Sequence, residues 1–392
     1  MKSRGAWVFF LMVVLTMSSV GCSSGSKQTA DASPQGDAAI ADAGSERVAD
    51  APAPGAEAGK DTAPAGGPEV ATLCPGIDPW GYDSPFVAGP TAFPDGVELL
   101  VASGDPIVMV ATDNDLYWAN EGTIHRMTLG DRVDKVLLDR SSTGNHFNYL
   151  AVDATTLYFT EGGLYQPYRV AKMPLDGSSA PVTLGGNISP WYVALAGDYV
   201  YYYDANLVEI DRLPIAGGTV TTLVRNVDPD SFVLANGHIY FTDQVTPVQD
   251  SLLSISLDAQ ASSPVDGGTD GGTGGLVTLA SNNAGISGPA FDGGYLFYID
   301  GGNVMKMPAG GGTATAFQTQ QSATPMGAIA AAGGNVYWVT GSQTCRNIMR
   351  AATDGSGQTT IVHALESPRK FALNATHLFI MTGSQQILRV PR

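Results

Sequence analysis

The stretch from Phe147 to Asn187, FNYLAVDATTLYFTEGGLYQPYRVAKMPLDGSSAPVTLGGN, is the unit on which most of the remaining chain is patterned. It contains four short runs rich in β-branched and aromatic residues, namely Tyr149–Val152, Thr156–Thr160, Tyr168–Met173 and Pro181–Leu184. Turn-forming residues separate the runs, among them Glu161-Gly162-Gly163 and Asp176-Gly177. Short runs of this kind between turns predict a four-stranded antiparallel meander.

Imperfect copies of this unit follow one another along the chain. The copies are aligned by a large apolar pair in the second run: Tyr117-Trp118, Tyr158-Phe159, Tyr201-Tyr202, Tyr240-Phe241, Phe297-Tyr298, Tyr337-Trp338 and Phe379-Ile380. Successive pairs are 41, 43, 39, 57, 40 and 42 residues apart. The long interval contains a glycine-rich insertion, Ser262 to Gly275, where a surface loop can grow at little cost. Four-stranded repeats of about 40 residues are typical of β-propellers.

Two further columns of residues support this alignment. A proline stands just before the first run in six copies, at positions Pro106, Pro190, Pro229, Pro289, Pro325 and Pro368. A cation stands in the third run of six copies, at Arg126, Lys172, Arg212, Lys306, Arg350 and Arg389, and Ser254 takes its place in the remaining copy. We expect the stems of these cations to pack between blades, with the charged heads paired to a neighbouring acid or carbonyl. A basic channel that binds a ligand is the alternative.

The two ends of the repeat region predict how the ring closes. The seventh copy, Lys370 to Arg392, ends after its third run, whereas an isolated strand-like run, Val97 to Ser103, precedes the first copy. This isolated run is similar to the fourth runs of other copies. We therefore expect an all-β fold, a seven-bladed β-propeller of four-stranded antiparallel blades, closed by an N-terminal strand that completes the last blade and removes a free edge.

The first 22 residues have the pattern of a targeting segment. Lys2 and Arg4 precede an apolar run, and Ser19-Val20-Gly21-Cys22 ends it. This end resembles the lipobox of bacterial lipoproteins, although Ser19 stands where leucine is usual. The resemblance implies that Cys22 is acylated and that the protein is an extracytoplasmic lipoprotein held at a membrane, with the outer membrane favoured. An ordinary signal peptide is the alternative, and a transmembrane helix is disfavoured because the run is short.

Two segments separate this leader from the propeller. Residues 23–70 are rich in Ala, Gly, Pro and Asp and contain no aromatic residue, which predicts a disordered tether. Residues 71–96 carry bulky side chains among prolines and glycines, so we expect an irregular segment packed on the propeller at residues 97–392. Cys74 and Cys345 then form an even pair in an oxidising compartment, and a disulfide between them is expected, with two unrelated thiols as the alternative.

Composition excludes several classes of partner and chemistry. With 37 acidic against 20 basic residues, the net charge of −17 argues against nucleic acid and anionic lipid as partners. The five histidines are scattered, and the sequence has no cluster with metal-ligand spacing, no nucleophile elbow and no phosphate loop. We therefore expect no metal, no cofactor and no catalytic residue, and a monomeric protein.

A binding site on a propeller is expected on one face of the ring. That face is made by the loops joining the fourth strand of one blade to the first strand of the next, and the second strand to the third. Its polar and aromatic residues are the candidate binding face: Glu121, Arg140, His146, Glu161, Tyr165, Tyr168, Trp191, Asp204, Arg225, Asp243 and Asp300.

Several of the second runs point to a family. Tyr117-Trp118-Ala119-Asn120, Tyr240-Phe241-Thr242-Asp243 and Tyr337-Trp338-Val339-Thr340 resemble the YWTD repeats of low-density-lipoprotein-receptor-type propellers, and the chain looks closer still to related propellers of bacterial surface lipoproteins. The resemblance covers residues 105–392. It implies a protein-binding or scaffolding module without catalysis. Receptor-type propellers of this family have six blades rather than seven, and no copy here has the full tetrad.

These observations predict a lipid-anchored propeller at the cell envelope that displays a recognition face for a protein or small-molecule ligand. One alternative is a propeller enzyme, lyase or hydrolase-like, with a site at the mouth of the central channel, where only His146 is available. Another is a purely structural envelope protein. Fold alone does not distinguish these three.

Overall fold

The chain divides into two units, Met1–Glu69 and Val70–Arg392. The computed structural model describes residues 96–163, 166–186, 188–246, 249–260, 275–282, 285–318, 328–341 and 345–392, all of which belong to the second unit. The predicted leader with Cys22, the tether, Cys74, Tyr165 and nearly all of the 71–96 segment lie outside these residues. No helix among them is long and apolar enough to span a bilayer.

The described residues form seven four-stranded antiparallel sheets, as the repeats predict. The first three blades comprise β2 (Val108–Ala111), β3 (Asp115–Ala119), β4 (Thr123–Thr128) and β5 (Asp134–Asp139); β6 (Asn145–Val152), β7 (Thr156–Gly163), β8 (Gln166–Pro174) and β9 (Val182–Gly186); and β10 (Pro190–Ala196), β11 (Tyr199–Asp204), β12 (Glu209–Pro214) and β13 (Thr221–Arg225). A 3-10 turn, η2 (Ser141–Thr143), joins the first blade to the second.

The remaining blades continue in chain order. They comprise β14 (Pro229–Ala235), β15 (His238–Thr246), β16 (Gln249–Ser256) and β17 (Val277–Asn282); β18 (Ile286–Asp292), β19 (Tyr295–Asp300), β20 (Asn303–Pro308) and β21 (Thr315–Gln318); β22 (Ile329–Ala332), β23 (Asn335–Gly341), β24 (Cys345–Ala352) and β25 (Thr359–Glu366); and β26 (Pro368–Leu373), β27 (His377–Thr382), β28 (Ile387–Pro391) and β1 (Glu98–Val101). The glycine-rich insertion falls between β16 and β17, as predicted.

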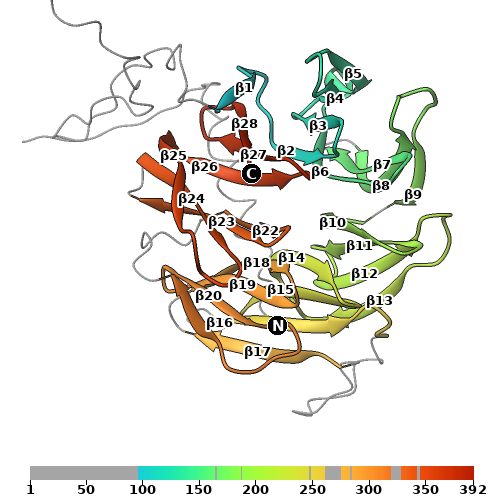
Figure 1. Ribbon diagram of the computed structural model, residues 1–392. Coiled ribbons are helices and arrows are strands. Elements are labelled where there is room, and N and C mark those ends of the chain that lie inside the picture. Colours follow the sequence, from blue (N-terminus) through green and yellow to red (C-terminus); the bar gives the residue numbers. More distant parts are fainter. Residues whose placement is uncertain are drawn as a thin grey trace, which may run out of the picture. The chain divides into compact units, whose positions relative to one another are not determined.

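The first strand of each blade is innermost, and these strands contact one another in sequence from β2 to β26 and back to β2. The seventh blade is completed by β1, which pairs antiparallel with β28 through the register Glu98↔Arg389 and Leu99↔Leu388. Figure 1 shows β1, in blue, beside β28, in red. The ends of the repeat region therefore meet in one sheet, and β1 covers the edge of β28 that would otherwise be free.

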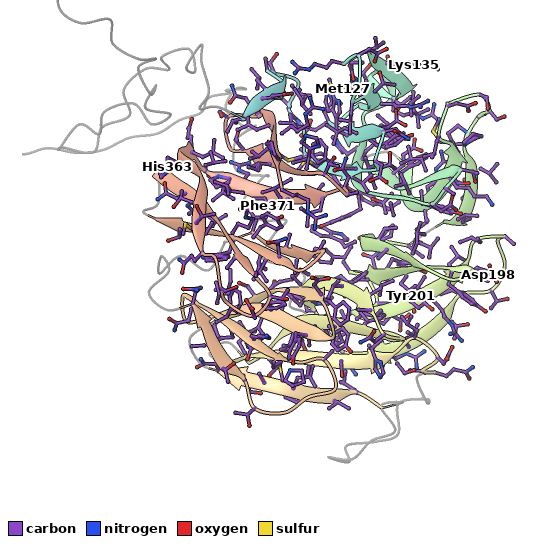
Figure 2. The ribbon with its side chains drawn as sticks, viewed as in Figure 1. Met127, Lys135, Asp198, Tyr201, His363 and Phe371 are labelled. Atoms are coloured by element: carbon purple, nitrogen blue, oxygen red, sulfur yellow. The ribbon has the colours of Figure 1, made fainter. Side chains whose placement is uncertain are left out.

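The described residues form seven apolar core clusters, one at each interface between neighbouring blades. The paired residues of each second strand explain this arrangement, because adjacent residues of a strand face opposite sides of its sheet. Tyr117 packs towards the second blade, and Trp118 packs towards the seventh. Tyr201 and Tyr202 divide in the same way between the fourth and second blades. Figure 2 shows the side chains that fill these interfaces, Tyr201 among them.

Four of the six cations of the third strands form clasps between blades, as predicted. Lys172 donates to the carbonyl of Ile215 at 2.7 Å, Arg212 to that of Leu257 at 2.6 Å, Lys306 to that of Thr353 at 2.7 Å and Arg389 to that of Leu129 at 3.0 Å. Each donor lies in one blade and each acceptor in the next. Arg126 instead pairs with Asp115 of its own blade.

Two predicted details need correction. Pro289 lies inside β18, at an irregularity between Ser287 and Ala290, rather than before the strand. A bulge accepts proline there because it interrupts the ladder of hydrogen bonds. His146 lies within β6 rather than in a loop, because β6 begins at Asn145, where it pairs with Gly163.

Candidate functional site

The described members of the candidate binding face lie at the end of the blades where the second strands end. Glu161, Asp204 and Asp300 lie at or near the ends of β7, β11 and β19, and Trp191 lies at the start of β10. Connections from the preceding blade reach the same end, because neighbouring strands are antiparallel. The structure thus brings these residues to one face of the ring, but it gives them different roles.

Glu161 is buried and organises the connection between the first two blades. Its carboxylate accepts hydrogen bonds from Arg140 at 2.9 Å, Asn145 at 2.9 Å and Arg169 at 2.8 Å. Burial alone would disfavour the ionised form, but these donors lower the pKa of Glu161 below its ordinary value. Ionised Glu161 therefore fixes the loop before β6, and two of the predicted binding residues, Arg140 and Glu161, are satisfied by each other.

Tyr168 is held close to this group by a glycine. A Cβ atom at Gly162 would lie 2.1 Å from the Tyr168 ring, so no other residue fits at position 162 without displacing the ring. Tyr168 thus packs directly on the backbone at the end of β7.

The residues that correspond to the last position of the YWTD tetrad also act as brackets. Asp204 accepts hydrogen bonds from the backbone N–H groups of Ser189 at 3.2 Å and Asn206 at 2.9 Å. Asp243 accepts one from the N–H of Asp228 at 2.9 Å, and Asp300 accepts one from Asn282. Each acid ties the end of a second strand to the chain arriving from the previous blade.

Arg225 makes a further ion pair on this face, at 3.0 Å from Glu209. Glu209 is buried and follows the turn after β11. Arg225 thus joins the end of the outermost strand of the third blade to the third strand of the same blade.

Aromatic side chains of the innermost strands form a second group, the aromatic cluster Tyr149, Trp191, Tyr192 and Phe232. The Tyr149 ring centroid lies 6.1 Å from that of Trp191 and 5.1 Å from that of Tyr192, and Tyr192 lies 6.0 Å from Phe232. The cluster thus runs across the second, third and fourth blades at the centre of the ring.

Trp191 is the exposed member of the aromatic cluster, with 40% of its surface accessible. It lies where the pairing of β10 with β11 is irregular, between Trp191 and Ala194, and Tyr192 there has a positive φ of 55°. A bulky residue in this region is strained, and such strain often marks a functional site.

An exposed turn of the same blade adds apolar surface. Leu207 is 60% exposed and Val208 is 37% exposed, and Val208 has a φ of 59°, unusual for a β-branched residue. The turn is tied to the chain before Trp191 by a hydrogen bond of 2.9 Å from Ala205 N–H to the Ser189 carbonyl. Trp191 and Leu207 therefore belong to one end of the third blade.

Acidic residues adjoin the aromatic cluster on the fourth blade. Asp228 and Asp230 are exposed, yet the pKa of Asp230 is raised by partial burial and by the charges of Asp250, Asp228 and Asp243. Burial, followed by the charge of Asp230, raises the pKa of Tyr192 to about 12. This coupling places Asp230 beside the aromatic cluster.

One cation reaches the cluster from the seventh blade. Lys370 Nζ lies 5.6 Å from the centre of the Tyr149 ring and donates to the Ile107 carbonyl at 2.8 Å. Lys370 is exposed to solvent. The protein around it near the ring centre nevertheless removes part of the water from its ammonium group, and this desolvation lowers its pKa. Lys370 thereby connects the seventh, first and second blades.

His146, the histidine expected near the mouth of the central channel, has one acidic neighbour, Glu121. His146 Nδ1 lies 4.0 Å from an Oε atom of Glu121, whose side chain is 77% exposed. Among the described residues, no group of three His, Cys, Asp or Glu side chains is arranged to hold a metal ion.

Sequence reasoning found Trp191 but missed Tyr149, Tyr192, Phe232, Asp230 and Leu207. Four of these lie in the innermost strands, which the loop-based search left out. A signal was present, since Trp191-Tyr192 interrupts the alternation of large and small residues expected of a regular strand.

Comparison with known proteins supports the fold alone. No protein-family model matches the chain, and no curated protein matches it. Similar solved structures include a chain of the mitotic checkpoint complex (10% identity, TM-score 0.51, covering 80% of this chain and 99% of that one) and a Mycobacterium tuberculosis puromycin-hydrolyzing peptidase (12% identity, TM-score 0.52, covering 73% and 51%). A chain of the nidogen/laminin complex is 19% identical, with a TM-score of 0.44, and the match covers 63% of this chain and 92% of that one.

Proposed function

We propose that the protein is a lipid-anchored, extracytoplasmic β-propeller that acts as a protein-binding or scaffolding module at the cell envelope. The observation that carries this proposal is the exposed apolar surface of the third blade, formed by Trp191, Leu207 and Val208 and called here the blade-3 patch. Exposed aromatic and aliphatic side chains at the polar face of a domain are typical of recognition surfaces. Val208 in the patch and Tyr192 beside Trp191 have strained backbone conformations, which suggests that this display is retained at a cost to stability.

The YWTD-like second strands support the same function. The fourth-position acids Asp204, Asp243 and Asp300 are committed to bracketing connections, so they shape the face rather than being free to bind a partner. The partner is therefore expected to contact the side chains that the brackets leave exposed. This focuses the predicted binding face on the blade-3 patch.

Site-specific photo-crosslinking in the producing cells tests the proposal. A photo-crosslinking amino acid at Leu207 should give a discrete adduct with one protein. The matched control is Val182, which is 57% exposed on the outermost strand of the second blade. Adducts that are equal at both positions, or absent at Leu207, would contradict a binding role for this face.

The anchor and the disulfide remain parts of the proposal with their own tests. Acylation at Cys22 predicts incorporation of an alkyne-labelled fatty acid that a Cys22→Ser variant loses. Pairing of Cys74 with Cys345 predicts a peptide linked through these two residues in a non-reducing digest. Unlabelled protein would contradict the lipid anchor, and free thiols at both cysteines would contradict the disulfide. Neither result bears on the proposed binding face.

A further inference from the structure

The charge around the blade-3 patch is uneven. On the second blade, Arg140 and Arg169 share the buried Glu161. On the fourth blade, Asp228 and Asp230 are exposed, and Asp228 accepts a hydrogen bond of 2.8 Å from the hydroxyl of Tyr203, the residue that pairs with Trp191 between β10 and β11. A partner that lies across Trp191 therefore meets negative charge on the side of the fourth blade.

The cations near this surface are already engaged. Arg225 pairs with Glu209 at 3.0 Å on the third blade. Lys370 donates to the Ile107 carbonyl and lies over Tyr149, on the side of the aromatic cluster away from Phe232 and the fourth blade. It is therefore poorly placed to neutralise Asp228 and Asp230. A cation from outside the chain would both relieve the repulsion among these acids and lie against an exposed aromatic face.

We infer that the blade-3 patch, together with Asp228 and Asp230, binds a basic segment of a partner protein, in which a Lys or Arg side chain meets Trp191 and the acids while a neighbouring apolar side chain covers Leu207 and Val208. This inference rests on the proposed binding function and names its partner chemistry. The apolar part of the surface favours a peptide over a small polyamine, which would leave Leu207 and Val208 exposed.

Asp230 contributes binding rather than stability. Because Asp230 has a raised pKa in the folded protein, its ionised form is disfavoured there. An Asp230→Asn variant should therefore fold with equal or greater stability. Any loss of binding in this variant then reports on recognition and not on unfolding.

A displayed library of random 12-residue peptides, selected against the full-length protein, tests the inference. Enriched peptides should pair a Lys or Arg with an adjacent aromatic or aliphatic residue, and their affinity should fall with added salt. Asp230→Asn and Trp191→Ser should each weaken binding about five- to tenfold. Asp198→Asn is the matched control, because it removes one exposed acid from the turn between β10 and β11, at the opposite end of the third blade, and should change the affinity less than twofold.

Three results would overturn the inference: enrichment of acidic or purely apolar peptides, equal affinity in all variants, or no enrichment. If Leu207 nevertheless crosslinks to a partner, the binding function stands and only the basic chemistry is wrong. If Leu207 gives no adduct and no peptide is enriched, both fail. If spermidine binds and no peptide is enriched, the site belongs to a small cation instead.

Discussion

Individual side chains on the face where the second strands end divide into those that hold the fold and those that are left exposed. Glu161, Asp204 and Asp243 are buried and accept hydrogen bonds from neighbouring N–H groups or arginines. Trp191 and Leu207 are exposed. Residue type in the sequence does not separate the two classes, since burial depends on which end of a strand reaches an incoming connection. A polar loop residue is thus a weak predictor of a binding residue.

One buried acid predicts an unusual dependence of stability on pH. Burial, only partly offset by Thr222 and reinforced by Glu209 and Asp204, raises the pKa of Asp211 from 3.8 to about 7. The folded state then binds more protons than the unfolded state between these values. The contribution of Asp211 to stability is therefore lost as pH rises from about 4 to about 7 and stays low above that.

Asp211→Asn should remove this dependence. At pH 8 we expect the variant to be more stable by about 1 to 3 kcal/mol, because it no longer ionises in the core. Urea unfolding of both proteins at pH 5 and pH 8 measures the effect. A variant that is less stable at pH 8, or equally changed at both pH values, would show that Asp211 is ionised and paired in the folded protein.

At the scale of strands and blades, the repeat pattern predicts most of the architecture. The paired large residues of the second strands recur because each pair packs towards both neighbouring blades. Four members of the cation column recur because each clasps the next blade. The sequence did not predict the irregularities in β6, β10, β14, β18 and β26. A bulge reverses which side chains face the centre, and it depends on contacts across the ring that no local pattern encodes.

The clasps should contribute unequally according to burial. Lys306 donates to the Thr353 carbonyl from a partly buried position and lies 4.0 Å from the centre of the Tyr295 ring. Lys306→Met keeps the stem but leaves that carbonyl without the donor, so we expect a loss of about 1 to 2 kcal/mol in the free energy of unfolding.

Lys135→Met is the control for this clasp. Lys135 also donates to a backbone carbonyl in the next blade, that of Asp176 at 2.9 Å, but in an exposed position. Its replacement should change stability by less than about 0.5 kcal/mol. Equal losses in the two variants would mean that burial of the clasp does not matter.

At the scale of the whole molecule, the ring is closed by a strand from the other end of the repeat region. Glu98 of β1 accepts hydrogen bonds from Arg389 of β28 and from Arg132 of the first blade, the latter at 2.6 Å. The hydrogen bond from Arg389 lowers the pKa of Glu98. Closure therefore depends on an ionised carboxylate at the seam between the seventh and first blades.

Glu98→Gln should weaken the seam most at neutral pH. Since the folded-state pKa of Glu98 lies below the ordinary value of 4.5, its stabilisation is present above that value and is lost as pH falls below it. The difference in thermal midpoint between wild type and variant should be largest near pH 7 and shrink towards pH 3. Glu121→Gln, remote from the seam, should show no such trend. An equal trend in both variants would show that Glu98 does not stabilise the closure.

The central claim is that one face of the ring, at the third and fourth blades, recognises a partner. Hydrogen–deuterium exchange of the full-length protein, with and without the protein crosslinked through Leu207, tests it most directly. We predict slower exchange at residues 189–192, 205–208 and 226–231 in the complex, with the outermost strands β5 and β9 unchanged. Protection of the outermost strands, or none on this face, would contradict the account.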